Sequence, residues 1–221
     1  MDLSPFFVSL RVAAIATVVT FFLGIAAANR VYQMKKGKGI MDSIFTLPMI
    51  LPPTVVGFFL LLIFGRNSPV GYILDTMGVS VVFSWIGAVI ASSVVAFPLM
   101  YRTTRGAFEQ VDQNVIYAAE TLGLSKLKIF WRIKVPMAKS GILAGTVLAF
   151  ARALGEFGAT IMLAGNIPGR TQTMAIAVFS AASANNRELA YQWVLILCIM
   201  SFVMMMLMNH WTGLNKRKNR K

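Results

Sequence analysis

Long apolar stretches alternate with short polar segments along the whole chain, and each of five apolar stretches is long enough to cross a membrane. An α-helix rises about 1.5 Å per residue, so roughly 20 apolar residues cross a hydrocarbon layer of about 30 Å. The pattern predicts spanning helices over residues 6–28, 40–64, 79–101, 140–164 and 191–211. We therefore expect an all-α polytopic membrane protein whose five transmembrane helices form one transmembrane domain.

Positively charged residues are concentrated in three of the polar segments. Residues 30–38, 102–139 and 216–221 hold 16 of the 21 Lys and Arg. Because cytoplasmic loops of membrane proteins carry an excess of Lys and Arg, all three segments are expected in the cytoplasm. Five spans then place the N-terminus outside and the C-terminus in the cytoplasm, and residues 65–78 and 165–190 become the external loops.

The last third of the chain contains an apolar segment of a different kind. Residues 174–184 are apolar but too short to span, and they are expected to form an interfacial or external helix. Trp193 and Trp211 lie near opposite ends of the fifth stretch, where Trp commonly marks the two membrane surfaces. Both are therefore expected to be interface anchors.

The composition excludes an ordinary soluble domain and narrows the chemistry. Hydrophobic residues make up 57% of the chain and charged residues 13%, with a mean hydropathy of +0.70. The net charge of +13 comes mainly from clusters beside apolar spans, so it indicates neither nucleic acid nor an anionic substrate. No group of His and Cys has the spacing of a metal site, and no stretch has the pattern of a phosphate-binding loop. We expect neither an enzyme nor a bound cofactor.

The segment over residues 105–139 is the longest polar one and predicts two short helices. Asp112 and Ser125 are typical N-caps, Gly123 suits the left-handed residue that ends a helix, and Pro136 is expected to stop the second helix. Helices of about ten residues are too short to be stable alone in water. Their apolar faces therefore need a partner, which could be another protein or the membrane surface.

Polar residues inside the apolar stretches are candidates for a translocation pathway. Arg152 and Glu156 are one helical turn apart and can pair, and each charge alone would cost about 3 kcal/mol in the bilayer. The pair is either a structural clamp or part of a conduit. Thr54 follows two prolines that break the second stretch. The break is either a packing kink or a sign that this helix faces a pathway. Ser92 and Ser93 are further pathway candidates, although such pairs more often bond to neighbouring helices.

The polar hairpin resembles the EAA loop of the membrane subunits of bacterial ABC importers. Tyr117-Ala118-Ala119, Gly123, Ile133 and Val135-Pro136 have the spacing of that motif, with Tyr117 in place of an acid and Val135 in place of Leu. In that family the loop forms coupling helices that dock in a groove of the ATP-binding subunit. The resemblance implies a docking set here: Ala118, Ala119, Glu120, Gly123, Leu124 and Pro136.

Further blocks resemble the molybdate/tungstate importer permeases. They are Leu51–Gly57, Phe64–Asn67, Ala96–Tyr101, Leu154–Thr160 and Ile167–Thr171. The resemblance implies a type I ABC importer transmembrane fold in the cell membrane and a homodimer of this chain. It also implies two ATP-binding subunits that hold ATP and Mg, and an external oxyanion-binding protein. Molybdate is the expected substrate, with tungstate also carried.

Two other functions remain open at this stage. The sulfate/thiosulfate importer permeases share the EAA loop and a related Glu-Phe-Gly block, so they resemble this chain too. A secondary transporter that needs no ATPase is the more remote alternative. Such transporters are often built from two similar halves, but the sequence shows no internal repeat and five spans do not divide evenly.

Overall fold

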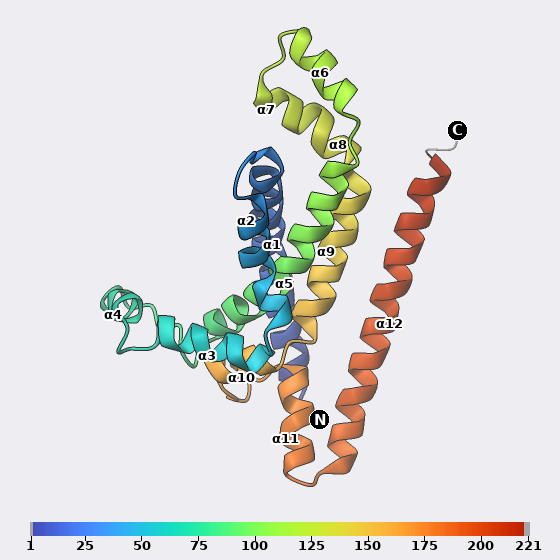
Figure 1. The fold of residues 1–221 in the computed structure, drawn as a ribbon. Helices are drawn as coiled ribbons and strands as arrows, with labels where there is room; N and C mark the ends of the chain where they lie inside the picture. The colour runs from blue at the N-terminus through green and yellow to red at the C-terminus, as the bar shows by residue number, and fades with distance from the viewer. Residues whose placement is uncertain (1, 219–221) are drawn as a thin grey trace.

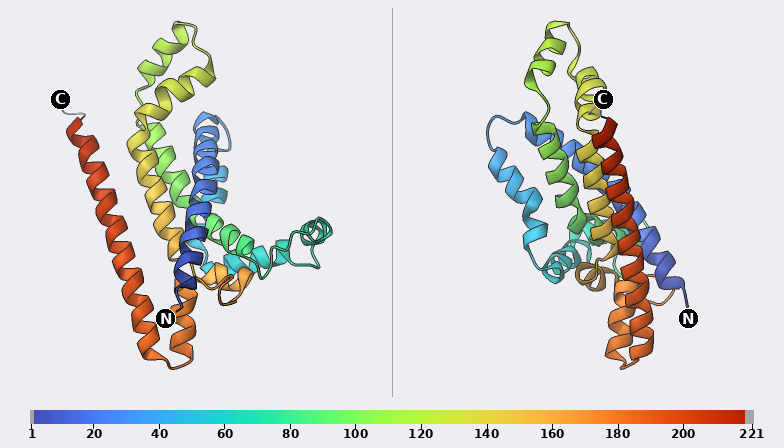
Figure 2. Two further views of the ribbon diagram at one scale, coloured as in Figure 1. Left: turned by 180° about the vertical axis from the view of Figure 1, so that it is seen from behind. Right: turned by 90° about the vertical axis from the view of Figure 1, so that its right-hand side faces the viewer.

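The computed structural model describes residues 2–218, and for residues 207–218 it describes the backbone alone. All regular structure within this part of the chain is helical (Figure 1). The centre is a group of three helices that pack against one another: α1 (Ser4–Gln33), α5 (Trp85–Glu109) and α9 (Lys139–Leu154). The two views of Figure 2 show a helical hairpin at one end of this group and α11 (Met174–Ser183) near the other end.

Three helices of the described chain are long and apolar enough to cross a membrane singly. They are α1, α5 and the part of α12 (Arg187–Lys218) that runs to Met206. Two bent helix pairs raise the number to as many as five if each pair counts as one span. They are Lys38–Ile50 with Pro53–Phe64, and Lys126–Met137 with Lys139–Leu154. Large apolar side chains such as Phe7, Phe22 and Phe202 are exposed on these helices, as expected for surfaces that face lipid.

The second apolar stretch, predicted over residues 40–64 with a break at its prolines, is divided there. It forms α2 (Lys38–Ile50) and α3 (Pro53–Phe64), which are bent by 110°. Leu51 is extended, with φ −69° and ψ 143°, because a residue before proline avoids the helical region. Pro52 and Pro53 also lack the N–H groups that would carry the helix across the break.

The fourth apolar stretch is broken as well, which corrects the continuous helix predicted over residues 140–164. Helix α9 ends at Leu154, and α10 (Gly158–Ala164) begins after a short non-helical link.

The third stretch, predicted over residues 79–101, is shifted along the sequence: α5 starts at Trp85 behind the N-cap Ser84 and continues to Glu109. The hairpin therefore begins later than residue 105. The short α4 (Pro69–Thr76) lies in the polar connection before α5.

Helix α11 is the short apolar helix predicted over residues 174–184, and its external or interfacial place stays a prediction. It contacts α12 and α1, and the Met174 N–H donates to Ser9 Oγ at 2.7 Å. Trp193 is buried within the protein, with 2% exposure, so its ring is not free to serve as the predicted interface anchor. The side chain of Trp211 lies outside the described residues.

Small residues allow the central helices to approach closely. A Cβ added to Gly141 of α9 would lie 2.4 Å from Cβ of Ala107 on α5, and one added to Gly145 would lie 3.1 Å from Sδ of Met100. Gly24 of α1 faces Met100 in the same way. In a membrane, close packing of this kind drives helix association, because lipid tails are as apolar as leucine. The three helices thus form one closely packed group that carries the hairpin.

Candidate functional site

The hairpin projects beyond the ends of α5 and α9 (Figures 1 and 2). It consists of α6 (Gln113–Thr121), α7 (Lys126–Ile129), a π-helical segment (Phe130–Lys134) and α8 (Val135–Met137). Helix α5 ends at Glu109, shortly before α6, and α9 begins directly after Ala138. A force on the hairpin therefore acts on both central helices through short connections.

Three local signals shape the hairpin, and each agrees with its prediction. Asp112 caps α6 by accepting the Asn114 N–H at 2.9 Å, and Ser125 caps α7 by accepting the Lys128 N–H at 3.4 Å. Gly123 has φ +76°. The N–H groups of Gly123 and Leu124 bond back to the carbonyls of Glu120 and Ala119, which is the paired pattern of a Schellman motif.

Pro136 does not stop the second helix, which corrects the sequence-based expectation. The chain stays helical through a π-helical segment and on to Met137, and the 73° bend comes at Ala138. Pro136 has no N–H to donate, and the π-helical segment directly before it changes the local hydrogen-bond pattern so that the helix continues. The π-helical segment, α8 and the start of α9 together form the root of the hairpin.

A buried lysine fastens this root to the rest of the protein. Lys134 is 5% exposed, and its Nζ donates to Asn29 Oδ1 of α1 at 2.9 Å. The same ammonium lies 3.4 Å from the ring centre of Tyr32 and 4.4 Å from that of Phe108. Tyr32 also accepts a hydrogen bond from Gln113 of α6. Burial lowers the pKa of Lys134 to about 8. No sequence signal links Lys134 to Asn29, so this anchor was missed.

The predicted docking residues lie mostly on the surface of the hairpin. Ala118, Glu120, Gly123 and Pro136 are exposed and Leu124 is half-buried, whereas Ala119 is 4% exposed and packs inside. Large apolar side chains surround them without cover from the described chain: Val115, Tyr117, Leu122, Leu127 and Trp131. Leu122 is the most exposed of these five, at 81%. An exposed apolar patch of this kind is typical of a protein or membrane interaction site.

The second candidate site lies where α9 breaks. The Arg152 Nη1 atom is 2.7 Å from Glu156 Oε2, so the predicted ion pair is present. Glu156 is 1% exposed, and its Oε1 accepts the Ala159 N–H of α10 at 2.7 Å. Its Oε2 receives no well-aligned hydrogen bond within the described chain. Arg152 therefore compensates the negative charge of the buried carboxylate, and the carboxylate in turn accepts a backbone N–H in the first turn of α10.

Of the other pathway candidates, Thr54 lies close to this break. A Cβ on Gly158 would lie 3.1 Å from N and 3.2 Å from Cγ2 of Thr54, so α3 and α10 cross almost without a gap. Thr54 itself is exposed. Ser92 is buried on α5, and Ser93 lines a groove of about 200 Å³ together with Thr20 and Pro48.

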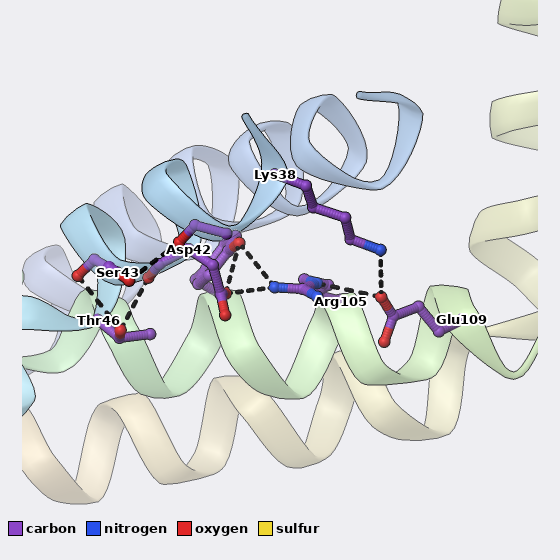
Figure 3. A network of polar contacts seen from close by, with 8 residues as sticks. Lys38, Asp42, Ser43, Thr46, Arg105 and Glu109 are labelled. Carbon is purple, nitrogen blue, oxygen red and sulfur yellow. Dashed lines mark hydrogen bonds and ion pairs between the residues drawn. The ribbon is translucent and has the colours of Figure 1, made fainter. Parts of the chain in front are cut away.

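A polar network between α2 and α5 was not predicted. Figure 3 shows Arg105 between two carboxylates: it pairs with Asp42 of α2 and, at 3.2 Å, with Glu109 of α5. Lys38 Nζ lies 2.8 Å from Glu109 Oε1, and the Tyr101 hydroxyl donates to Asp42 at 3.0 Å. The spacing of Arg105 and Glu109 is visible in the sequence, but their partners on α2 are not.

Comparison with known proteins gives a consistent picture. Residues 20–220 match the family described as binding-protein-dependent transport system inner membrane component. The chain is 44% identical over 204 residues to a putative molybdenum transport system permease protein of Bacillus subtilis, covering 91% of this chain and 90% of that one. It is 40% identical over 205 residues to the molybdenum transport system permease protein ModB of Escherichia coli, covering 92% and 90%. A sulfate transport system permease protein of Synechococcus elongatus is 33% identical over 200 residues, covering 90% and 70%.

Solved structures share the fold at low sequence identity. An inward-facing form of the MetNI methionine ABC transporter has a TM-score of 0.74 at 14% identity, covering 95% of this chain and 93% of that one. A bacterial ABC transporter involved in alginate import has a TM-score of 0.77 at 15% identity, covering 96% and 78%. This likeness agrees with the fold class expected from the sequence.

The buried Lys134 gives a pH-dependent prediction. An unfolded lysine has a pKa of 10.5, whereas the folded one has a pKa of about 8. Between these values the unfolded chain holds a proton that the folded chain has lost, so stability increases with pH. Below pH 8 both forms are charged and the effect is constant. We expect the melting temperature of the purified chain to rise across this window relative to Lys134→Met. The exposed Lys128→Met serves as a control, and an equal rise in both comparisons would contradict the prediction.

The Arg152–Glu156 pair gives a second prediction. Arg152→Ala leaves a buried carboxylate without its partner, which is expected to cost on the order of 3 kcal/mol. Arg152→Ala combined with Glu156→Gln removes that charge and keeps an oxygen for the Ala159 N–H. The double variant should therefore melt at a higher temperature than Arg152→Ala alone. Strictly additive effects in this cycle would exclude the pairing.

Proposed function

Because the chain belongs to the family of binding-protein-dependent transport system inner membrane components, we propose that it is the permease subunit of an ABC importer that carries molybdate into the cell. The carrying observation is its 44% and 40% identity to two molybdenum permeases over about nine-tenths of both chains. The sulfate permease is more distant at 33% identity, and it keeps sulfate or thiosulfate as the second candidate substrate.

The proposal includes an assembly of several chains. Two copies of this permease would pair in the inner membrane with the N-terminus outside and the hairpin in the cytoplasm. Two ATP-binding subunits would hold ATP and Mg and hydrolyse the nucleotide, and an external binding protein would deliver molybdate or tungstate. The uncovered apolar side chains of the hairpin support docking to a protein, and the three basic segments support this orientation.

The geometry suggests how this chain would do its part. The hairpin leads into α5 on one side and α9 on the other, so displacement by the ATP-binding subunit would move the central helices. Both α2–α3 and α9–α10 are interrupted, and such breaks are tolerated in a membrane where the backbone faces protein or a water-filled path. Thr54, Arg152 and Glu156 lie at these breaks and are the proposed pathway residues, with Ser92 and Ser93 as further candidates on α5.

Uptake of labelled molybdate by the complete transporter in proteoliposomes tests the substrate. We expect uptake that requires ATP inside and binding protein outside, and that excess tungstate reduces at least tenfold. Excess sulfate should reduce it less than twofold. Inhibition by sulfate alone would move the assignment to the second candidate, and uptake on an ion gradient without ATP would reject an ABC importer altogether.

Gly123 tests the docking role of the hairpin. Valine at φ +76° is strained, because a β-branched side chain collides with its own backbone in the left-handed region. Gly123→Val should reduce co-purification of the ATP-binding subunit at least tenfold by distorting the turn between α6 and α7. Gly78→Val is a matched control, because Gly78 has φ +74° and open space around it, outside the hairpin. Unchanged co-purification of Gly123→Val would show that the docking surface lies elsewhere, and equal loss in both variants would mean that strain anywhere in the chain has this effect.

A further inference from the structure

We propose that Arg105 is a positioning residue that makes α2 follow the hairpin, so that movement of the hairpin reaches the break between α2 and α3. The proposal rests on the proposed function, because it requires an ATP-driven hairpin. Three observations carry it: the ionic cluster around Arg105, the sparse attachment of α2 to its other neighbours, and the contact of α10 with the start of α3, which follows α2.

The ionic cluster lies beside the hairpin. Arg105 and Glu109 occupy the last turns of α5, and α6 begins at Gln113. Arg105 is the central member, because it contacts carboxylates on both helices, and its side chain is 19% exposed. The cluster holds two positive and two negative groups, so losing one of them leaves an unbalanced charge in a partly buried site. Arginine suits the central place because its planar fork can pair with two partners at once.

Helix α2 is attached to the rest of the chain mainly through α5. Phe45 packs edge-on against Phe97 and Tyr101, with ring centres 5.5 Å and 5.2 Å apart. Contact between α2 and α1 is much slighter, and the groove of about 200 Å³ lined by Thr20 and Pro48 lies on that side. Since its packing is mainly with α5 and the groove separates it from α1, α2 can follow α5 where the cluster holds it.

The far end of α2 leads directly to the second candidate site. Helix α2 has 13 residues and is therefore about 20 Å long. Beyond it, Pro53 and Thr54 begin α3, and both lie against Gly158, two residues after the buried Glu156. Held at one end by Arg105, α2 can thus carry a displacement from the hairpin root to the broken helices.

The experiment measures coupling in the complete transporter, with its ATP-binding subunits and binding protein, in proteoliposomes. The quantity is molybdate taken up per ATP hydrolysed. Arg105→Gln and Asp42→Asn should each lower this ratio at least tenfold, while the ATP-binding subunit still co-purifies. The double variant should be no worse than Arg105→Gln, because both changes break one link. Arg105→Lys keeps the charge and should recover part of the ratio. Lys36→Gln, an exposed change close to Lys38, should leave it unaltered.

The outcomes separate this inference from the proposed function. A wild-type transporter that takes up no molybdate with ATP overturns the proposed function and the inference with it. A working wild type with a normal ratio in both single variants overturns the inference alone. Loss of assembly in Arg105→Gln would assign that residue to folding, and Asp42→Asn, which keeps the shape of its side chain, then decides. A normal ratio in Asp42→Asn would overturn the link to α2.

Discussion

A helix that breaks inside a membrane must find new partners for the backbone groups that the break leaves unpaired. In this chain Glu156 supplies one of them by accepting the Ala159 N–H, and Arg152 balances the charge that this role buries. The break also allows Gly158 to lie directly against the start of α3. The ion pair and the capping bond therefore stabilise the broken geometry in which α3 and α10 cross.

Under the proposed function, the hairpin can move the central helices only if its base is held firmly against them. Lys134 meets this requirement by giving up its hydration to lie between Asn29 and the rings of Tyr32 and Phe108. Burial of a charge is costly, and the lowered pKa of Lys134 reflects that cost. In return, the root of the hairpin is held against two central helices, while its tip stays exposed for a partner.

Local features of the fold could be predicted from the sequence, and long-range ones could not. The caps at Asp112 and Ser125, the turn at Gly123 and the Arg152–Glu156 pair each depend on residues at most four apart. Hydropathy identified the apolar stretches, and Pro52 and Pro53 marked the break in the second of them. The break after Leu154 was missed, because no proline marks it and hydropathy does not report the direction of a helix. The path through Pro136 was mispredicted because a π-helical segment precedes the proline and lets the helix continue, and the sequence gives no sign of such a segment. The links from Arg105 to Asp42 and from Lys134 to Asn29 join distant segments and left no local signal.

The pairing of Arg152 also bears on how an anion would pass. A free arginine within a pathway would attract an oxyanion strongly and would also hold it, whereas conduction needs binding weak enough to release. Glu156 neutralises that guanidinium at 2.7 Å, so the break offers no uncompensated positive charge from this pair. Under the proposed function, tight selection of molybdate then falls to the external binding protein. The permease needs only to open and close, and rigid coupling of its helices to the hairpin serves that task.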